Sequence, residues 1–367
     1  MAIRQHKYSR SSEPKNERYC IFCGKPPIDQ NKEHVFPVWL ISLTGDPNRN
    51  GNFGFDTNKF PKKRNFAFKS FVFPACKICN DKFGEELEIP SSKIVKKILA
   101  HQPVSEIEMD KLLDWLDKIR IGLWLGKQQL NKAWNFIKPL EYIDGRIGTK
   151  DRLLIAYEID KKYKGIEYIG TDTPAFTFAP CCFGLIINNL VLLNASGDHL
   201  FSKNIGFPYP LDVTPIEDDS SHYNIRLTNG EAVVKYPLID EFQTTGVEIY
   251  QPIVPLYARS GYETIYNNLY VNERLLDHSA GKGKFLVKSS TKNLKWVDNE
   301  NLLLLHFSIY EKKFLLRTIG KQVLNIQNYV LLNRPQIWDA DPQKIIFYNE
   351  KYNEAINFNN KLKSMLR

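Results

Sequence analysis

The sequence predicts an α+β protein in which a small N-terminal domain with little core of its own precedes a larger, β-rich α+β domain. Three observations predict this division. Two CxxC pairs, Cys20–Cys23 and Cys76–Cys79, lie close to the N-terminus, and the 367 residues exceed the usual size of a single core. Past Asp144-Gly145 the sequence changes to short β-rich runs. We therefore predict three segments: a flexible basic arm (1–17), a first domain (18–104) and a second domain (105–367).

The two cysteine pairs are the strongest local signal. A CxxC pair on a tight turn directs two sulfurs at one centre, so both pairs together predict a closed structural zinc site made by Cys20, Cys23, Cys76 and Cys79. Such an ion contributes on the order of 10 kcal/mol to folding, enough to staple the small domain. Two unrelated redox or packing pairs, or a disulfide framework, are the weaker interpretations, because the chain shows no export signal.

A Glu33-His34 pair lies between the cysteine pairs. Neighbours on an extended strand point to opposite sides, so Glu33 could reach a divalent cation while His34 faces an attacking water. A free imidazole titrates near neutrality, as a general base requires. Asn80 begins a predicted helix over 80–88 and offers an amide oxygen as a further ligand. Alone, a histidine is more often a surface or packing residue, but its place between the cysteine pairs favours the catalytic interpretation.

Together these motifs resemble the HNH endonucleases, in particular those whose ββα-metal finger carries a four-cysteine zinc. The matching residues span about 18 to 90 and are Cys20-x-x-Cys23, Glu33-His34-x-x-Pro37 and Cys76-x-x-Cys79-Asn80-x-x-Phe83-Gly84-x-x-Leu87-Glu88. The resemblance implies that His34 is the general base, that Glu33 and Asn80 bind a catalytic Mg²⁺ or Mn²⁺, and that cleavage leaves a 5′-phosphate. Glu33 stands where the family commonly has an aspartate or a histidine. The family's middle asparagine stays open among Asn58, Asn65 and Ser70.

The charge distribution favours a polyanionic partner. Residues 1–104 hold 18 Lys and Arg against 10 Asp and Glu, whereas the rest of the chain holds 32 against 31. Phenylalanines, which we interpret mainly as local core, are interleaved with five basic residues that we predict to contact nucleic acid: Lys59, Lys62, Lys63, Arg64 and Lys69. We predict that the partner is DNA rather than RNA.

The remaining elements follow from periodicity and turn signals. A short helix is predicted over 92–100. Ser105 and Glu108 form a capping box that begins a helix over 106–126, which continues over 127–136. Strands are predicted over 153–159, 176–178, 183–193, 232–236, 247–252, 285–288 and 302–310, with 314–319 pairing with the last of them. A closing helix is predicted over 342–366.

Four motifs in the larger region receive structural interpretations. Glu217-Asp218-Asp219 is interpreted as an acidic loop rather than a second metal cluster. Gly281-Lys282-Gly283-Lys284 lacks the spacing of a phosphate-binding loop and is interpreted as a hairpin turn. Cys181-Cys182 is interpreted as buried packing, and His199 as a structural residue despite its neighbour Asp198.

Three functions are therefore compared. The first is a metal-dependent HNH endonuclease whose C-terminal region senses an activator ligand, targets the substrate or recruits a protein partner, a layout similar to bacterial phage-defence effectors. The second is a zinc-stapled nucleic-acid-binding protein without catalysis, and the third is an interaction or signalling protein. With no apolar run long enough to span a bilayer and no export signal, we predict a cytoplasmic protein without a membrane partner.

Overall fold

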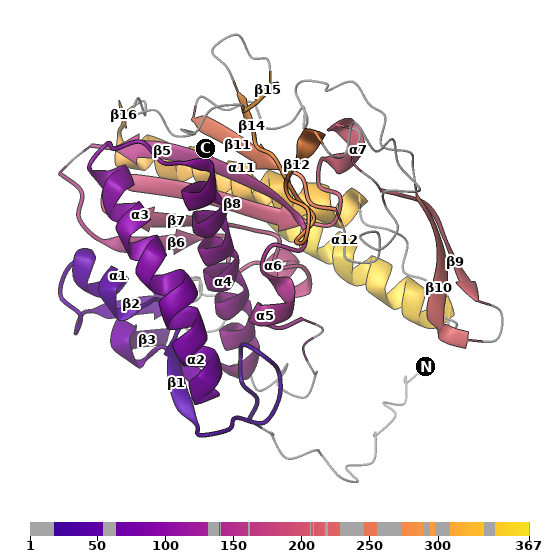
Figure 1. Ribbon diagram of the computed structural model, residues 1–367, viewed down its shortest axis with the longest axis horizontal. Coiled ribbons are helices and arrows are strands. Elements are labelled where there is room, and N and C mark those ends of the chain that lie inside the picture. Colours follow the sequence, from indigo (N-terminus) through magenta and orange to yellow (C-terminus); the bar gives the residue numbers. More distant parts are fainter. Residues whose placement is uncertain are drawn as a thin grey trace, which may run out of the picture.

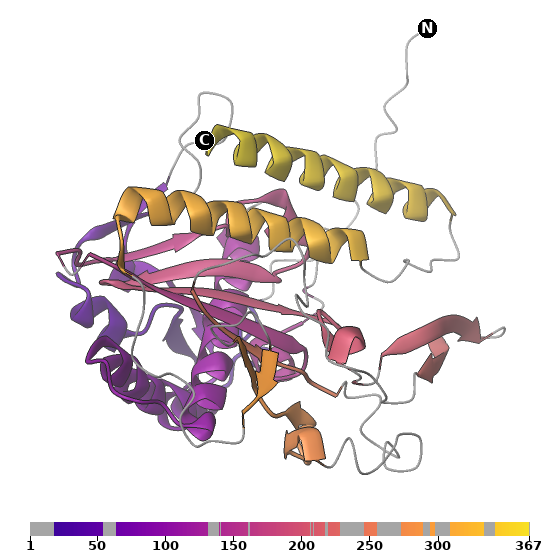
Figure 2. The same ribbon diagram turned by 90° about the horizontal axis from the view of Figure 1, so that it is seen from above.

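A central β-sheet separates two helical layers in the computed structural model (Figure 1 and Figure 2). One layer contains helix α4 (Glu106–Leu130) and the N-terminal module, by which we mean residues 18–99, and the other contains helix α11 (Lys312–Asn333). The structure describes residues 18–53, 64–130, 139, 141–160, 162–205, 207, 209–216, 219–227, 246–254, 273–288, 294–297, 309–333 and 342–366.

The N-terminal module is built on two short antiparallel strand pairs. β1 (Asn31–His34) pairs with β4 (Val72–Ala75), and β2 (Asn50–Phe53) pairs with β3 (Arg64–Ala67). Pro37 ends the extended segment that follows β1 and precedes helix α1 (Val38–Leu43). A single 3₁₀ turn, η1 (Phe68–Ser70), separates β3 from β4.

One continuous helical segment follows β4 directly. It consists of α2 (Lys77–Phe83), the π-helical turn η2 (Gly84–Glu88) and α3 (Ile89–Leu99). We predicted separate helices over 80–88 and 92–100, and this separation is wrong. The π turn shifts the hydrogen-bond register just before Pro90, the residue that has no N–H to donate, and the helix continues through it.

Helix α4 confirms the predicted capping box. The Ser105 N–H donates to Glu108 Oε2 over 3.0 Å, and the Glu108 N–H donates to Ser105 Oγ over 3.2 Å. The helix extends to Leu130, four residues beyond the first predicted end, and residues 131–136 of the predicted continuation lie outside the described residues. A Cβ on Gly126 would lie 2.5 Å from the Phe73 ring, so the α4 backbone packs directly against β4.

The central sheet has eight strands. Its order is β15-β14-β11-β5-β8-β7-β6, with β16 beside β5 in the only parallel pairing among the described strands. The strands are β5 (Asp151–Ile159), β6 (Ile166–Ile169), β7 (Cys182–Ile187), β8 (Leu190–Gly197), β11 (Val247–Gln251), β14 (Leu286–Lys288), β15 (Leu294–Trp296) and β16 (Ile309–Tyr310). The predictions over 153–159, 247–252 and 285–288 are confirmed.

Both faces of this sheet are buried in apolar cores. On β5, Leu154 and Ala156 join the core that contains α4, whereas Leu153 and Ile155 join the core that contains α11. This alternation follows from the two-residue period of a strand. The first core runs without a break from Phe22 in the N-terminal module to the sheet. The domain boundary after residue 104 stays a prediction, and apolar packing crosses it.

Three predicted strands have a different structure. Residues 176–178 belong to helix α6 (Pro174–Phe178), because Pro174 occupies its first turn and Thr173 Oγ1 accepts from the Phe176 N–H over 3.0 Å. The run 183–193 is a hairpin of β7 and β8 that turns at Asn188, where φ is 52°. Residues 314–319 lie in α11, whose buried side chains recur at helical spacing.

The remaining elements surround this frame. They are the helices α5 (Ile143–Arg146), α7 (Ser202–Ile205) and α12 (Pro342–Met365), and the strand pairs β9 (Pro210–Ile216) with β10 (Asp219–Leu227) and β12 (Leu275–Asp277) with β13 (Lys282–Gly283). The closing helix over 342–366 is thus confirmed, and α12 packs against α11. The hairpin interpretation of residues 281–284 is also supported, since β13 pairs with β12. The predicted strand over 232–236 and most of that over 302–310 lie outside the described residues.

Candidate metal centre

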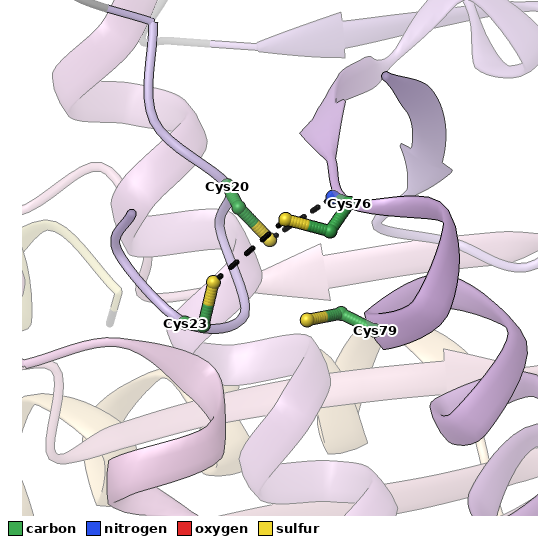
Figure 3. A group of neighbouring side chains, drawn as sticks. All are labelled: Cys20, Cys23, Cys76 and Cys79. Atoms are coloured by element: carbon green, nitrogen blue, oxygen red, sulfur yellow. Dashed lines mark hydrogen bonds between the residues drawn. The ribbon is translucent and has the colours of Figure 1, made fainter. Parts of the chain in front are cut away.

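Four cysteine sulfurs converge at the base of the N-terminal module. The Sγ atoms of Cys20, Cys23, Cys76 and Cys79 all lie within 4.8 Å of one another. Figure 3 shows the first pair on the loop before β1 and the second pair at the start of α2, with the sulfurs turned toward a common centre. None of the four forms a disulfide. This set of donors can hold a metal ion such as zinc, which accepts four thiolates in tetrahedral geometry.

The surroundings of the sulfurs suit a bound cation. The Cys76 N–H donates to Cys20 Sγ over 3.2 Å, and the Ile28 N–H donates to Cys76 Sγ over 3.3 Å. Burial and the neighbouring thiols raise the pKa of Cys79, so its thiolate needs a cation beside it. A cation bound at the centre would, together with these backbone N–H donors, stabilise deprotonated sulfurs.

A glycine shapes the loop that carries the first cysteine pair. Gly24 has φ 73°, its N–H donates to the Cys20 carbonyl over 2.8 Å, and a Cβ there would lie 2.4 Å from the Tyr142 ring. Only glycine fits both the left-handed backbone and this close approach. The tight turn brings Cys20 and Cys23 to the same side.

His34 lies at the end of β1 and is held from one side. Its Nε2 is 3.1 Å from the backbone oxygen of Lys69. A carbonyl oxygen can only accept, so Nε2 carries the proton and Nδ1 of the neutral ring remains an acceptor. Burial lowers the pKa of His34, and the Lys118 charge acts in the same direction. The half-buried imidazole is therefore neutral near pH 7, the form that accepts a proton.

The Glu33 side chain points to the side of β1 opposite His34 and forms an ion pair with a lysine. Its carboxylate forms an ion pair with Lys118 from α4, and only 7% of the residue is exposed. Burial raises the pKa of Glu33, while Lys118 opposes this shift. Lys118 also contacts Glu88 Oε1 over 2.5 Å. The carboxylate that the sequence assigned to a catalytic cation thus already has a cationic partner.

Asn80 occupies the first part of α2, directly after Cys79. Its N–H donates to the Cys76 carbonyl over 3.0 Å, so Asn80 belongs to the same turn as the second cysteine pair. α2 packs beside β1, the strand of Glu33 and His34. The fold brings the strand and the helix together. In this structure Glu33 is paired with Lys118. The binding of one cation by both Glu33 and Asn80 therefore stays a prediction.

The predicted basic segment is described only in part. Lys69 is exposed, and its Nζ donates to Asn48 Oδ1 over 2.5 Å. Lys59, Lys62, Lys63 and Asn58 lie outside the described residues, and only the backbone of Arg64 and Asn65 is described, on β3. Ser70 Oγ donates to the Ala67 carbonyl over 2.7 Å. The choice among Asn58, Asn65 and Ser70 stays open.

Lys118 is the residue near the site that sequence reasoning missed. The signal lay in the predicted helix over 106–126, whose apolar side chains surround its axis and leave no wholly polar face. Charged residues on such a helix are buried and need partners. Asp114, Asp117, Lys118 and Arg120 are all buried in α4.

The four motifs given structural interpretations carry no second centre in the described residues. Burial raises the pKa of Cys181 to about 12, as expected of a packing thiol. Asp198 forms an ion pair with Lys150 over 3.0 Å. Glu217 and Asp218 lie outside the described residues, and Asp219 begins β10. The cysteine cluster is the one group of metal-binding side chains found in the described part of the chain.

Comparisons of the chain with protein-family models, with curated proteins and with solved structures found no match. Among the described residues, no helix is both long and apolar enough to cross a membrane.

Proposed function

We propose that the protein is a metal-dependent HNH endonuclease that hydrolyses phosphodiester bonds in nucleic acid, with DNA favoured. The arrangement of β1, β4 and α2 around the four sulfurs is the observation that carries the proposal. An antiparallel strand pair that leads directly into a helix is the order of a ββα-metal finger. His34 lies on β1 and Asn80 lies on α2, an order that supports the comparison with the family motif.

The state of His34 supports a role as general base. The Lys69 carbonyl fixes the ring and leaves Nδ1 as an acceptor, so this nitrogen can take a proton from a water molecule. A half-buried, neutral imidazole at the end of a short strand is suited to that step. A catalytic Mg²⁺ or Mn²⁺, when bound, would stabilise charge on the scissile phosphate. Glu33 can serve this cation only after Lys118 releases it.

A structural zinc and a basic surface complete the proposal. The four cysteines would hold Zn²⁺ with no open coordination position, so the ion clamps the module and takes no part in catalysis. The net charge of +8 over residues 1–104, against +1 over the rest, supports binding to phosphates. The C-terminal region would sense a ligand, target the substrate or bind a partner, as in phage-defence effectors of similar layout.

The ion pair between Glu33 and Lys118 favours a second candidate, a zinc-stapled nucleic-acid-binding protein without catalysis. The two candidates differ in one assay. Purified full-length protein is incubated with supercoiled plasmid, linear duplex, single-stranded DNA and RNA, each with and without Mn²⁺, beside His34→Ala. The nuclease proposal predicts Mn²⁺-dependent cleavage by the wild type or by Lys118→Met, in which Glu33 has no lysine partner, and His34→Ala should lose it while it keeps its zinc and its affinity for nucleic acid. Binding without cleavage on every substrate, by Lys118→Met as well as by the wild type, would support the second candidate.

A further inference from the structure

Lys118 occupies the position of a bound cation beside Glu33. Its Nζ contacts the Glu33 carboxylate, lies 2.5 Å from Glu88 Oε1 and lies 3.3 Å from the His34 carbonyl oxygen. The side chain is 1% exposed. Three oxygen atoms, two of them from carboxylates, thus surround one ammonium group inside the protein. Carboxylate and carbonyl oxygens are also the ligands that hard divalent cations prefer.

Glu88 holds this lysine firmly. The second oxygen of Glu88, Oε2, accepts from Trp39 Nε1 over 2.9 Å and from Trp115 Nε1 over 3.1 Å. Two indoles therefore fix the carboxylate, and its place at the end of the π turn η2 directs it toward α4. Lys118 has a fixed partner on one side and Glu33 on the other.

An ammonium group and a divalent cation exclude each other at Glu33. Both need the same carboxylate, and two positive charges in a buried, low-dielectric site repel each other strongly. Lys118 must therefore withdraw before Glu33 can bind Mg²⁺ or Mn²⁺. The present conformation is one in which the predicted ligand is blocked by a residue of the same chain.

One turn before Lys118, helix α4 is also bound to the sheet. Asp114 contacts Arg152 Nη1 over 2.5 Å and Lys282 over 2.9 Å. Asp117, the neighbour of Lys118, forms an ion pair with Arg120 within α4 and lies 3.9 Å from Arg152 Nη1 on β5. One helix thus carries Lys118 toward β1 and the aspartates toward the sheet. A displacement of α4 relative to β1 would move Lys118 away from Glu33.

We propose that Lys118 is an autoinhibitory latch that keeps Glu33 from binding the catalytic cation until α4 shifts. The latch rests on the proposed function and explains how an endonuclease could be kept inactive within one chain. It also reconciles the family motif with the ion pair, because Glu33 acts as a ligand only in the released state.

Mn²⁺ binding tests the latch without any measurement of cleavage. The zinc-loaded full-length chain is titrated with Mn²⁺, and free Mn²⁺ is followed by its electron paramagnetic resonance signal. Wild type, Glu33→Gln, Lys118→Met and the double variant form one cycle. Lys118→Arg retains the charge and is the matched control. Zinc content and thermal unfolding are recorded for each protein.

The latch predicts strong coupling between the two positions. Lys118→Met should tighten Mn²⁺ binding by about tenfold or more, and Glu33→Gln should abolish this gain while changing the wild-type affinity by less than about twofold. Lys118→Arg should bind like wild type. If Lys118→Met does not fold, Lys118→Gln, which is also uncharged, takes its place in the cycle. Tight Mn²⁺ binding by wild type that Glu33→Gln removes would overturn the latch, as would a folded Lys118→Met protein with unchanged affinity.

The two proposals fail in different ways. Because the latch keeps the wild type inactive, cleavage is scored in folded Lys118→Met. A Lys118→Met protein that cleaves no substrate but shows the predicted Mn²⁺ cycle would overturn the endonuclease function and keep the exclusion at Glu33. A chain that cleaves DNA with additive effects in the cycle would overturn the latch and keep the function.

Discussion

The N-terminal module and the central sheet are stabilised in different ways. In the module, β1 is four residues long and Glu33 is its one buried residue. In the sheet, β5 is nine residues long and buried throughout, between two apolar cores. The module instead gathers four sulfurs within 4.8 Å. We therefore expect the sheet to be stable through burial alone and the module, although it shares the first core, to depend also on an ion held by the four sulfurs.

Removing zinc should expose this difference most strongly. We expect chelation to destabilise the module by on the order of 10 kcal/mol, because four thiolates lose their cation. Hydrogen exchange followed by mass spectrometry should show that peptides of β1 and α2 lose protection while β5 and β8 retain it. Cys76→Ser should give the same pattern, and Cys181→Ala, a buried cysteine outside the cluster, should not. Uniform loss of protection across the chain would contradict the separation.

Asp117 tests the charged contacts between α4 and the sheet. It is fully buried, lies 3.9 Å from Arg152 Nη1 on β5, forms an ion pair with Arg120 within α4 and accepts from the Gly148 N–H over 3.2 Å. Asp117→Asn should destabilise the protein by about 3–5 kcal/mol, because Arg120 loses its buried counter-ion. Chemical unfolding measures the change. Asp81→Asn, at an exposed ion pair on α2, should stay within about 0.5 kcal/mol of wild type.

Asp117 should also make the stability of the protein depend on pH. Burial alone would raise the pKa of Asp117, but Arg120, Arg146 and Arg152 together lower it below its ordinary value. A lowered folded-state pKa stabilises the protein above the unfolded-state pKa, which is about 3.9, and this stabilisation is lost as the pH falls through the folded-state value. Asp117→Asn should therefore lose less stability than wild type between pH 5 and acid. An equal loss in both proteins would contradict this assignment.

Part of the difference between the N-terminal module and the central sheet could be predicted from the sequence. The spacing of Cys20, Cys23, Cys76 and Cys79 was enough to predict their convergence, since each pair is local. The capping box at Ser105 is equally local and is confirmed. The strand predicted over 314–319 is wrong. Six residues with several apolar side chains are too few to distinguish a strand from a helix, whereas the spacing of the buried side chains over the full length of α11 identifies a helix.

Lys118 could not be assigned to Glu33 because their contact is tertiary. The two residues lie 85 positions apart and meet only when α4 packs on β1. The same holds for the two indoles on Glu88. Sequence spacing predicts which side chains one turn brings together, but it does not predict which helix covers a strand.

Gly126 tests the packing between the two regions. A Cβ there would lie 2.5 Å from the Phe73 ring, which is buried. Gly126→Ala should destabilise the protein by about 1–3 kcal/mol, because α4 must move away from β4. A Cβ on Gly145, which also lies in a helix, would meet no described atom within 4 Å, so Gly145→Ala is the matched control and should be near neutral. Thermal unfolding of the two variants compares them, and equal melting temperatures would contradict close packing.

The mildest substitution concerns the start of α4. Ser105→Ala removes the acceptor for the Glu108 N–H and should lower the free energy of unfolding by about 1 kcal/mol. Ser364→Ala, an exposed serine in α12, should have no measurable effect. Chemical unfolding of both proteins measures the difference. A loss as large as that of Asp117→Asn would mean that Ser105 has a further role.

We expect one zinc ion to join the loop before β1 to the start of α2 and thereby to stabilise the module. X-ray absorption at the zinc edge tests this expectation directly. We predict one zinc per chain, surrounded by four sulfur atoms at about 2.3 Å. A shell that contains nitrogen or oxygen ligands, or a chain that folds fully without zinc, would show that the four cysteines do not form this site.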